Sequence, residues 1–526
     1  MKKQNLLQVT CTVAFGVAAL AAESVRAQGS DELLRFSRYN FGIATARSAG
    51  MGGAYTSLGA DGATMSINPA GISMYGHSEV GISPGLRITS QRADYSGSGG
   101  NVSNRLGNTK GNIGSFSMVY ANGNFAVGFG MNRLADFNGR SRAIGYGEQF
   151  SIGDMFVEQL YGIPASNIGA PENDIYQAFF RYPPKLWGGI LGYQAGLFDP
   201  VAGTGGPDQP SQQYTTQGMI QPGTLLYPEL YRRTSGTVNE YTISGGYNFK
   251  DILYVGATLG IQDIYYNRFD TYSEATTVTN VGLHSLFYDQ NLRMSGAGVN
   301  LKVGATVRPV PWLRIGVAYH SPTWINMSEE YDGAMTVFYT QPIAGYDYGF
   351  SDTPISRDEY NMRTPSRLLA GISATIGSVG IVSLDYERVW YQDMKYTSDG
   401  FQDINEGTTA TPGIRELYGP TDMVRAGVEF QPVRSLFLRA GYGYSTSPYR
   451  GSEFRRYGEY QQWSGGIGFR NHRVNIDLAY VYGTTREMPF KPYSDTGSDG
   501  YPVATDGTIY PRDKNHNLIL SVAFKF

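Results

Sequence analysis

The chain has 526 residues, 68 of them glycine and 40 tyrosine, and a formal net charge of −3 at pH 7. A charge so close to neutral argues against a nucleic-acid partner, which would need a basic surface. Its single cysteine, Cys11, excludes a disulfide framework and a thiolate metal site. No segment after the first thirty residues has the roughly eighteen consecutive apolar residues of a membrane helix.

The first residues have the pattern of an export signal. Lys2 and Lys3 precede an apolar run over about 6–22, and Val25-Arg26-Ala27 offers a small-residue cleavage site before Gln28. We therefore expect residues 1–27 to be a signal peptide, so that Cys11 is absent from the mature protein.

The most informative pattern after that is alternation of apolar and polar residues. In the last stretch, Leu518, Leu520 and Val522 fall on one parity, whereas Asn517 and Ser521 fall on the other. Successive side chains of a strand point to opposite faces, so one face is apolar and the other is polar. About 9–11 tilted residues cross a bilayer as a strand, and only a closed barrel leaves no unpaired backbone edge in the hydrocarbon.

Fourteen stretches show this alternation, an even number that suits a bacterial barrel. They are 80–91, 113–121, 124–137, 239–249, 252–269, 296–308, 312–325, 365–376, 380–391, 422–431, 435–447, 461–470, 473–485 and 515–526. Turns of two to four residues alternate with long loops, which cover 93–112, 138–238, 270–295, 326–364, 392–421, 448–460 and 486–516. A soluble sandwich would alternate too, but would not sort its loops by length. We predict an all-β fold, a 14-stranded antiparallel transmembrane β-barrel over 78–526, with short periplasmic turns and long extracellular loops.

Charged residues support this assignment of strands, because they avoid the positions that would face lipid. An Arg or Lys on the lipid face costs about 2–4 kcal/mol at the bilayer midplane. The lumen charges predicted from parity are Arg314, Asp385, Glu387, Arg425, Glu429, Arg439 and Asp477. Paired carboxylates such as Asp385 and Glu387 can do acid–base chemistry, but the nearby arginines favour ion pairs that anchor a plug. Trp312 and Trp324 have the inward parity and are not counted in the aromatic belts.

Residues 28–77 precede the first predicted strand. They could be a disordered tail, but they carry more apolar mass than a solvated tail holds comfortably, including Leu33, Phe36 and Ile43. A lumen enclosed by fourteen strands is too wide for its own side chains to fill. We therefore predict an N-terminal plug, or hatch, folded inside the barrel.

Within this segment, Gly50-Met51-Gly52-Gly53-Ala54-Tyr55, Ala60-Asp61 and Asn68-Pro69-Ala70-Gly71 resemble the hatch signature of the long-chain fatty acid transporter family (FadL/TodX). The clear likeness covers about 47–85, and the rest of the chain is similar in architecture only. The plug-motif residues are Gly50, Gly52, Gly53, Ala54, Asn68, Pro69 and Ala70. The resemblance implies passive uptake of a hydrophobic compound that the loops capture, that passes a rearranging plug and that leaves through the barrel wall.

Two features depart from the family pattern. The loop at 138–238 is unusually long, and the family's wall kink in the third strand has no counterpart, because 124–137 contains no proline. In the first strand, Pro84 between Gly81 and Gly85 predicts a wall bulge, since proline cannot donate to the ladder. The exit route therefore stays open, and no ligand-binding residue transfers from the family.

The long loop 138–238 is the best candidate for recognition, as a partly helical extracellular lid. Its aromatic and aliphatic residues have helix-like spacing. The ligand-capture candidates are Phe150, Phe156, Leu160, Tyr161, Phe179, Phe180 and Trp187. These side chains could equally pack the loop into a lid without touching a ligand.

Signals of catalysis are weak. Gly81-Ile82-Ser83-Pro84-Gly85 fits the Gly-x-Ser-x-Gly hydrolase pattern, but that elbow needs a sharp strand-to-helix turn and here the strand continues. The five histidines show no metal-ligand spacing. We expect no enzyme activity, no metal and no cofactor.

The sequence thus predicts an outer-membrane passive transporter for hydrophobic small molecules, of fatty acid or aromatic type, in a Gram-negative-type bacterium. The alternative is a plugged barrel that serves as a structural platform or adaptor for a secretion or surface-attachment complex. A polar-solute porin is disfavoured by the plug. Expected partners are the ligand, outer-membrane lipid and, through the C-terminal Phe526, the barrel assembly machinery; we expect a monomer and no nucleic acid.

Overall fold

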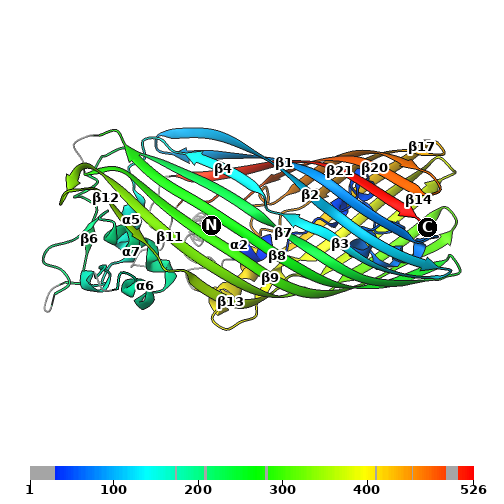
Figure 1. Cartoon of the computed structure of the whole chain (residues 1–526), viewed down its shortest axis with the longest axis horizontal. Helices are drawn as coiled ribbons and strands as arrows, with labels where there is room; N and C mark the ends of the chain where they lie inside the picture. The colour runs from blue at the N-terminus through cyan, green and yellow to red at the C-terminus, as the bar shows by residue number, and fades with distance from the viewer. Residues whose placement is uncertain are drawn as a thin grey trace, which may run out of the picture.

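The computed structural model describes residues 30–171, 174–206, 210–278, 282–408, 412–452, 454–492 and 507–526. The predicted signal peptide lies outside these residues. The described chain forms one elongated barrel with helices inside it and at one end (Figure 1). We call the end that carries the long connections the upper end and the end that carries the tight turns the lower end.

Fourteen antiparallel strands form the wall among the described residues, and β1 pairs with β21 to close it. They are β1 Glu79–Gly97, β2 Gly100–Asn122, β3 Phe125–Asp136, β7 Leu226–Phe249, β8 Leu253–Thr276, β9 Leu283–Val310, β10 Leu313–His320, β14 Arg367–Ile376, β15 Gly380–Trp390, β17 Pro420–Val433, β18 Leu436–Ser445, β19 Tyr460–Arg470, β20 Val474–Arg486 and β21 Thr508–Lys525. The predicted fold, a 14-stranded antiparallel barrel, is confirmed.

The wall extends well above the predicted spans. Further strands prolong it at the upper end: β4 Gly139–Ile144, β11 Trp324–Ile343, β12 Tyr346–Asp352, β13 Ser356–Arg363 and β16 Lys395–Tyr396. The predicted loops 93–112, 270–295 and 326–364 are therefore wrong, since most of each is strand. At the upper end the inward side chains pack against the lid, as Leu226, Leu286 and Tyr288 do, and the outward side chains meet water. The backbone ladder therefore continues without the alternation that marks a membrane span.

The two parities face different surroundings, as predicted. The outward side chains of Ile315, Leu438 and Leu478 are 48%, 43% and 40% exposed, whereas Asp385 and Arg425 are buried inside. Trp324 was assigned the wrong face: it is exposed on the outside, because the break between β10 and β11 at Ser321–Thr323 reverses the parity.

The N-terminal segment lies inside the barrel as a string of short helices. These are α2 Ser30–Arg35, η1 Phe41–Ile43, α3 Ala46–Gly50, α4 Thr64–Ile67 and η2 Pro69–Met74. The Thr45 side chain caps α3 by accepting from Ser48 N, and the Asn68 side chain caps η2 by accepting from Ala70 N. Pro69 follows Asn68 at the first helical position, where a missing N–H costs nothing. We call residues 30–76 the plug.

A second helical unit covers the upper end; Figure 1 shows it at the left (Figure 1). It contains α5 Ile152–Gln159, η3 Ala165–Asn167, α6 Gln177–Arg181, η4 Pro184–Leu186, α7 Trp187–Gln194, and the short strands β5 Asp199–Pro200 and β6 Tyr214–Thr215. We call residues 145–225 the lid. Three further helical turns lie in the later loops, η5 Tyr391–Asp393, α8 Gln402–Glu406 and α9 Ile414–Leu417. In the described part of the chain, no helix has both the length and the apolar character needed to cross a membrane.

Candidate functional site

A cavity with a volume of about 430 Å³ lies inside the barrel, between the plug and the wall. Leu34, Tyr39 and Ile43 of the plug form one side of it. Strands β1 to β3, β20 and β21 supply residues to the other side, and so does the segment after β20. The apolar side chains in the lining include Leu34, Ile43, Leu134, Phe137, Tyr266, Met423, Met488 and Phe490.

The same cavity also carries an excess of cationic side chains. Its lining contains Arg35, Arg38, Arg87, Arg133 and Arg232. Each of the five lies within 4.0 Å of a carboxylate: Arg35 is 3.3 Å from Glu32, Arg38 is 3.5 Å from Glu487, and Arg232 is 2.9 Å from Asp270. Arg87 and Arg133 share one carboxylate, Asp136, at 3.9 Å and 3.7 Å. The cavity can therefore accommodate an apolar body together with an anionic group.

An acidic plug residue, Asp31, shares this lining. Burial raises the pKa of its carboxyl to about 6, despite a hydrogen bond donated by the Tyr418 hydroxyl and the attraction of Arg35. Neutralising Asp31 at mildly acidic pH would increase the cationic excess of the cavity.

The wall beside the cavity is irregular at Pro84. In the β1–β2 ladder Ser83 pairs with Ser115, but Pro84 pairs with Ile113, so Gly114 has no partner. In the β1–β21 ladder the pairs stop at Ile82 and resume at Gly85. Proline has no N–H to donate, which interrupts both ladders at one point. The structure thus places a bulge between the predicted residues Gly81 and Gly85, centred on Pro84.

A second irregularity, which sequence reasoning missed, separates β2 from β3. Their pairs run upward from Asn122 and Phe125 to Ser115 and Asn132 and then end, although both strands continue. Above this point Asn112 and Gly114 on one side and Leu134 on the other line the cavity. The wall therefore lacks its backbone ladder where the cavity reaches it, and we call this place the β2–β3 gap.

One side-chain contact bridges the gap higher up. Lys110 Nζ on β2 donates to Asn138 Oδ1, just after β3, over 2.8 Å. The sequence does carry one signal of the gap, which is the polar run in β2 from Asn104 to Asn112. A strand that pairs on both edges and faces lipid would have apolar residues at every second position, and this run does not.

The plug passes directly behind the bulge. The Ala46 N–H donates to Ser521 Oγ over 2.8 Å, and the hydroxyls of Ser83 and Ser521 are 2.7 Å apart. A Cβ added at Gly114 would lie 3.0 Å from the Ala44 carbonyl oxygen. Residues 44–46 of the plug therefore border the inner side of the wall irregularity.

Most of the predicted lumen charges meet one another and the plug. Asp385 accepts from Tyr55 N and Thr56 N, both over 2.7 Å. Glu387 pairs with Arg367 at 2.9 Å and with Arg425. Arg367 also donates to the plug carbonyl of Ser37.

The remaining predicted charges form a second group lower in the lumen. Arg439 pairs with Glu429 and with Asp477, each at 2.7 Å, and Glu429 lies 3.3 Å from the plug residue Arg47. Arg314 does not join either group and has no ion pair among the described residues. Its Nε is buried without a hydrogen-bond partner among the described residues.

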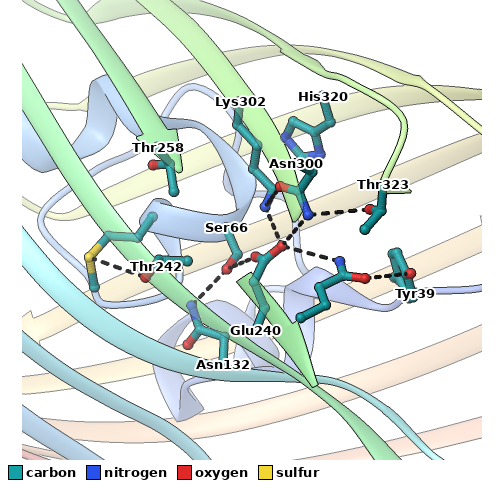
Figure 2. Close-up of polar contacts among 12 residues, drawn as sticks. Tyr39, Ser66, Asn132, Glu240, Thr242, Thr258, Asn300, Lys302, His320 and Thr323 are labelled. Carbon is teal, nitrogen blue, oxygen red and sulfur yellow. Dashed lines mark hydrogen bonds and ion pairs between the residues drawn. The ribbon is translucent and has the colours of Figure 1, made fainter. Parts of the chain in front are cut away.

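A third polar group, absent from the predicted site residues, holds the middle of the plug (Figure 2). Glu240 pairs with Lys302 and accepts from Ser66 Oγ over 2.7 Å. His320 Nε2 lies 2.8 Å from the Ile67 carbonyl oxygen. In the sequence, this group could have been found only from the inward parity of its strand residues and from their position opposite the plug.

The plug motif serves close packing against the wall. Gly52 and Gly53 have φ of 67° and 76°, which favours glycine, and a Cβ on Gly52 would lie 2.8 Å from Tyr442 N. Asn68 donates to the Thr56 carbonyl over 2.7 Å, and its oxygen accepts from Ala70 N over 3.1 Å. Gly50 and Ala54 are buried with them. These residues shape the plug, and none of them lines the large cavity.

The predicted ligand-capture residues divide into two sets, and none lines the cavity. Phe156, Leu160, Phe179 and Trp187 are at most 4% exposed and pack in the core of the lid. Phe150, Tyr161 and Phe180 are exposed on its surface. The first set packs in this way because helices α5 and α7 turn their apolar faces toward each other and toward the barrel rim.

Two adjacent phenylalanines give a test of this division. Phe179→Ala should destabilise the lid by about 3–5 kcal/mol, because it opens a cavity in a packed core. Phe180 is 74% exposed, so Phe180→Ala should change the stability of the lid by less than about 0.5 kcal/mol. Limited proteolysis of the lid measures the difference. Equal protease sensitivity of the two variants would contradict it.

The lid is joined to the barrel by Glu274, in the part of β8 above the predicted span 252–269. Its carboxylate accepts from Ser151 Oγ, Ile152 N and Tyr272 OH at 2.5–2.7 Å, so that it caps the start of α5. Burial raises the pKa of Glu274 to about 7, with Asp154 adding to the shift.

This raised pKa predicts a pH dependence of the lid. The pKa of Glu274 is higher in the folded protein than its ordinary value of 4.5, so its protonated form stabilises the fold. This contribution is complete below pH 4.5 and is lost as the pH rises through about 7. We expect α5 amides to be better protected from hydrogen exchange at pH 5 than at pH 8, after correction for intrinsic rates. Glu274→Gln should flatten this dependence, and an unchanged profile in that variant would contradict the assignment.

Comparisons with known proteins give one kind of match. No family model and no curated protein matches the chain. Among solved structures, it is similar to the CymD monoaromatic hydrocarbon channel, with 15% identity over 93% of this chain and 99% of that chain and a TM-score of 0.48. It is also similar to the Pseudomonas putida toluene transporter TodX, with 13% identity over 92% and 98% and a TM-score of 0.46. A Pseudomonas aeruginosa FadL homologue gives 12% identity over 93% and 98% and a TM-score of 0.49.

Identities and TM-scores of this size say nothing about the ligand. What the chain itself shows is a helical segment with the Asn68-Pro69-Ala70 motif inside a barrel of fourteen described strands. In its hatch motif and in this order of elements, the chain is similar to the FadL/TodX family of outer-membrane proteins.

Proposed function

We propose that the chain is an outer-membrane channel that lets a hydrophobic small molecule pass without chemical change. The molecule enters at the upper end under the lid, occupies the cavity beside the plug and leaves sideways through the β2–β3 gap. The periplasmic end stays closed by the plug. Phe526, at the lower end of the wall, is proposed to serve recognition by the barrel assembly machinery.

One observation carries this proposal: a single cavity contacts both the plug and the part of the wall that lacks its ladder. The cavity includes Ile43 on the plug side and Gly114 and Leu134 on the wall side. Outward side chains below the gap, such as Phe129 and Met118, are 46% and 48% exposed in the apolar band. A molecule that leaves at this height therefore enters hydrocarbon and not water.

The chemistry of the cavity favours an amphiphile over a plain hydrocarbon. Apolar residues such as Phe137, Tyr266 and Phe490 suit an alkyl chain or a ring. Arg35, Arg38 and Arg133 suit a carboxylate, which arginine binds through paired hydrogen bonds. Of the two predicted ligand types, we therefore propose the fatty acid type.

Proteoliposome uptake tests this function. The full barrel, reconstituted in liposomes, should accelerate the uptake of a fluorescent long-chain fatty acid relative to empty liposomes and should leave the permeability to a small sugar low. Uptake of both compounds would indicate a porin. Uptake of neither, from a barrel shown to be folded by its heat-modifiable gel mobility, would refute transport.

The platform alternative is favoured by one surface. Tyr346, Tyr348 and Phe350 lie on alternate positions of β12, at the tip of the upper end, and are 71%, 54% and 55% exposed. A folded barrel without uptake that still forms a stoichiometric complex through this tip would support a platform role.

A further inference from the structure

The outside of the wall carries a row of four arginines just above the apolar band. Arg486 on β20 pairs across the ladder with Arg512 on β21, Arg512 pairs with Arg92 on β1, and Arg92 pairs with Arg105 on β2. These four strands are consecutive in the closed wall, and Figure 1 shows β20, β21, β1 and β2 along one side. We call Arg486, Arg512, Arg92 and Arg105 the arginine row.

The row faces outward. On β21, Arg512 has the parity of the exposed lipid-face residues Leu518 and Leu520, and its side chain is 52% exposed. The Arg92 side chain is 42% exposed, and Arg105 and Arg486 are exposed as well. The four guanidinium groups are therefore accessible from the membrane side of the wall.

Little negative charge balances the row. Asp94 lies 2.7 Å from Arg92 and 3.7 Å from Arg512. Within the described residues, neither Arg105 nor Arg486 has a carboxylate within 4.0 Å. Like charges directly opposite each other destabilise a sheet, so four such positions in a line need an external anion to be favourable.

Some other outward arginines of the upper wall are balanced locally. On the opposite side of the barrel, Arg293 and Arg357 lie 3.6 Å and 2.9 Å from Glu330. The arginine row, four neighbouring arginines that share one carboxylate, therefore differs from this balanced cluster. Arg140 and Arg233, which pair across the β4–β7 ladder, are a second exposed pair without a carboxylate within 4.0 Å among the described residues.

An aromatic belt lies below the row and crosses β18, β19, β20 and β21, of which the last two also carry the row. The rings of Tyr442 and Trp463, of Trp463 and Tyr482, and of Tyr482 and His516 are 5.6, 5.8 and 5.1 Å apart. A surface pocket joins belt and row, and it is lined by Ser90, Arg105, Tyr480, Tyr482, Lys514 and His516. Aromatic belts mark the level of lipid headgroups.

We propose that the arginine row, with Lys514, binds the phosphate groups of an anionic lipid in the leaflet at the upper end of the barrel. This inference rests on the proposed placement in the outer membrane. The belt sits on the glycerol or sugar part of the lipid, and the acyl chains continue down the apolar band that includes Leu518. Arginine is suited to this role because its planar fork makes paired hydrogen bonds to phosphate.

Native mass spectrometry of the full-length protein in a neutral detergent tests the site. The probe is diphosphoryl lipid A, and phosphatidylcholine is the neutral reference. We expect wild type to retain diphosphoryl lipid A and to lose phosphatidylcholine. The double variant R105Q/R512Q should bind the lipid A probe at least about tenfold more weakly, since it removes two charge-assisted contacts.

Two variants keep the test specific. R105K/R512K retains the charges and should bind lipid A with intermediate affinity. R293Q/R357Q removes the same number of arginines from the balanced cluster around Glu330 and should bind lipid A as wild type does. Heat-modifiable gel mobility confirms that each barrel is folded. Fatty acid uptake should be unchanged in R105Q/R512Q, because Arg105 and Arg512 are outside the wall and neither of them lines the cavity, whereas Arg92 does and is left in place.

Four outcomes would overturn the inference. The first is that wild type and R105Q/R512Q bind lipid A equally, and the second is that R293Q/R357Q loses as much lipid A binding as R105Q/R512Q does. The third is that wild type retains phosphatidylcholine as well as it retains lipid A. The fourth is that millimolar inorganic phosphate displaces the lipid, which would indicate a site for a free anion. Lipid binding that depends on the row, in a wild-type protein without fatty acid uptake, would support this inference and refute the transport proposal alone.

Discussion

Replacing Glu387 by alanine is expected to weaken the hold of the barrel on its plug more than any other single change. Glu387 lies between Arg367 and Arg425, whose side chains are 4% and 2% exposed. Without it two buried guanidinium groups lose their counter-charge, which costs about 3–5 kcal/mol when a buried pair is broken. A difference of this size changes the ratio of plugged to unplugged barrels by a factor of about 10² or more.

The loss is transmitted to the plug by contacts on both arginines. Arg367 donates to the Ser37 carbonyl, and a Cβ added at the plug residue Gly53 would lie 3.2 Å from Arg425 Cδ. Repulsion between unpaired Arg367 and Arg425 would therefore push directly on both ends of residues 37–53. We expect frequent opening events in planar-bilayer recordings of Glu387→Ala, where wild type should be mostly closed.

A matched change separates this effect from a general loss of ion pairs. Glu330 also lies between two arginines, Arg293 and Arg357, but outside the wall and partly exposed. Exposed pairs contribute about 0–1 kcal/mol, so Glu330→Ala should conduct as wild type does. Glu387→Gln, which keeps the volume, covers the case in which the alanine variant fails to fold. Closed recordings from a folded Glu387→Gln barrel would contradict the anchoring role.

The lumen charges show why parity could predict so much of the interior. Asp385 and Glu387 are two residues apart, so they share a face, and neither could face lipid at an acceptable cost. Strand alternation therefore fixes which charges point inward. It does not fix which strands are opposite one another across the plug, so the pairing of Glu429 with Arg47 and the isolation of Arg314 were beyond the sequence.

The failures of prediction share a physical cause. Alternation reports lipid on one face, and it stops where the strand leaves the membrane, although the backbone ladder continues; Ala93 still pairs with Asn104 above the predicted span. Trp324 was assigned to the lumen because a parity count cannot detect a break such as the one at Pro322. The β2–β3 gap was missed because it is a loss of pairing between two strands and leaves no single breaking residue in β3.

The lid illustrates a different limit. Helical spacing in 145–225 correctly indicated apolar faces, but a buried apolar face and a ligand-binding face have the same sequence pattern. Phe156 packs edge-on to Tyr288 of the barrel rim, with ring centroids 5.8 Å apart, so the lid uses its aromatic residues to seat itself on the wall. Recognition inside the cavity depends instead on residues from the plug and from distant strands, which only the fold brings together.

The exit through the β2–β3 gap makes a prediction that depends on one glycine. Gly114→Val places a branched side chain in the cavity lining, where even a Cβ would lie 3.0 Å from the Ala44 carbonyl oxygen and 3.4 Å from the Ser83 carbonyl oxygen. The added methyl groups would fill the space between plug and wall that the ligand must cross. We expect uptake of the fluorescent fatty acid to fall by about tenfold or more, which corresponds to a barrier of about 1.4 kcal/mol or more.

Gly111 is the matched control, since it lies on the same strand three residues away and a Cβ there meets nothing within 4 Å. Neither glycine has a positive φ among the described backbone angles, so valine should not strain the strand at either position. Gly111→Val should transport as wild type does. Full uptake by a folded Gly114→Val barrel would show that the ligand does not leave at this place, and it would leave the plug or another part of the wall as the route.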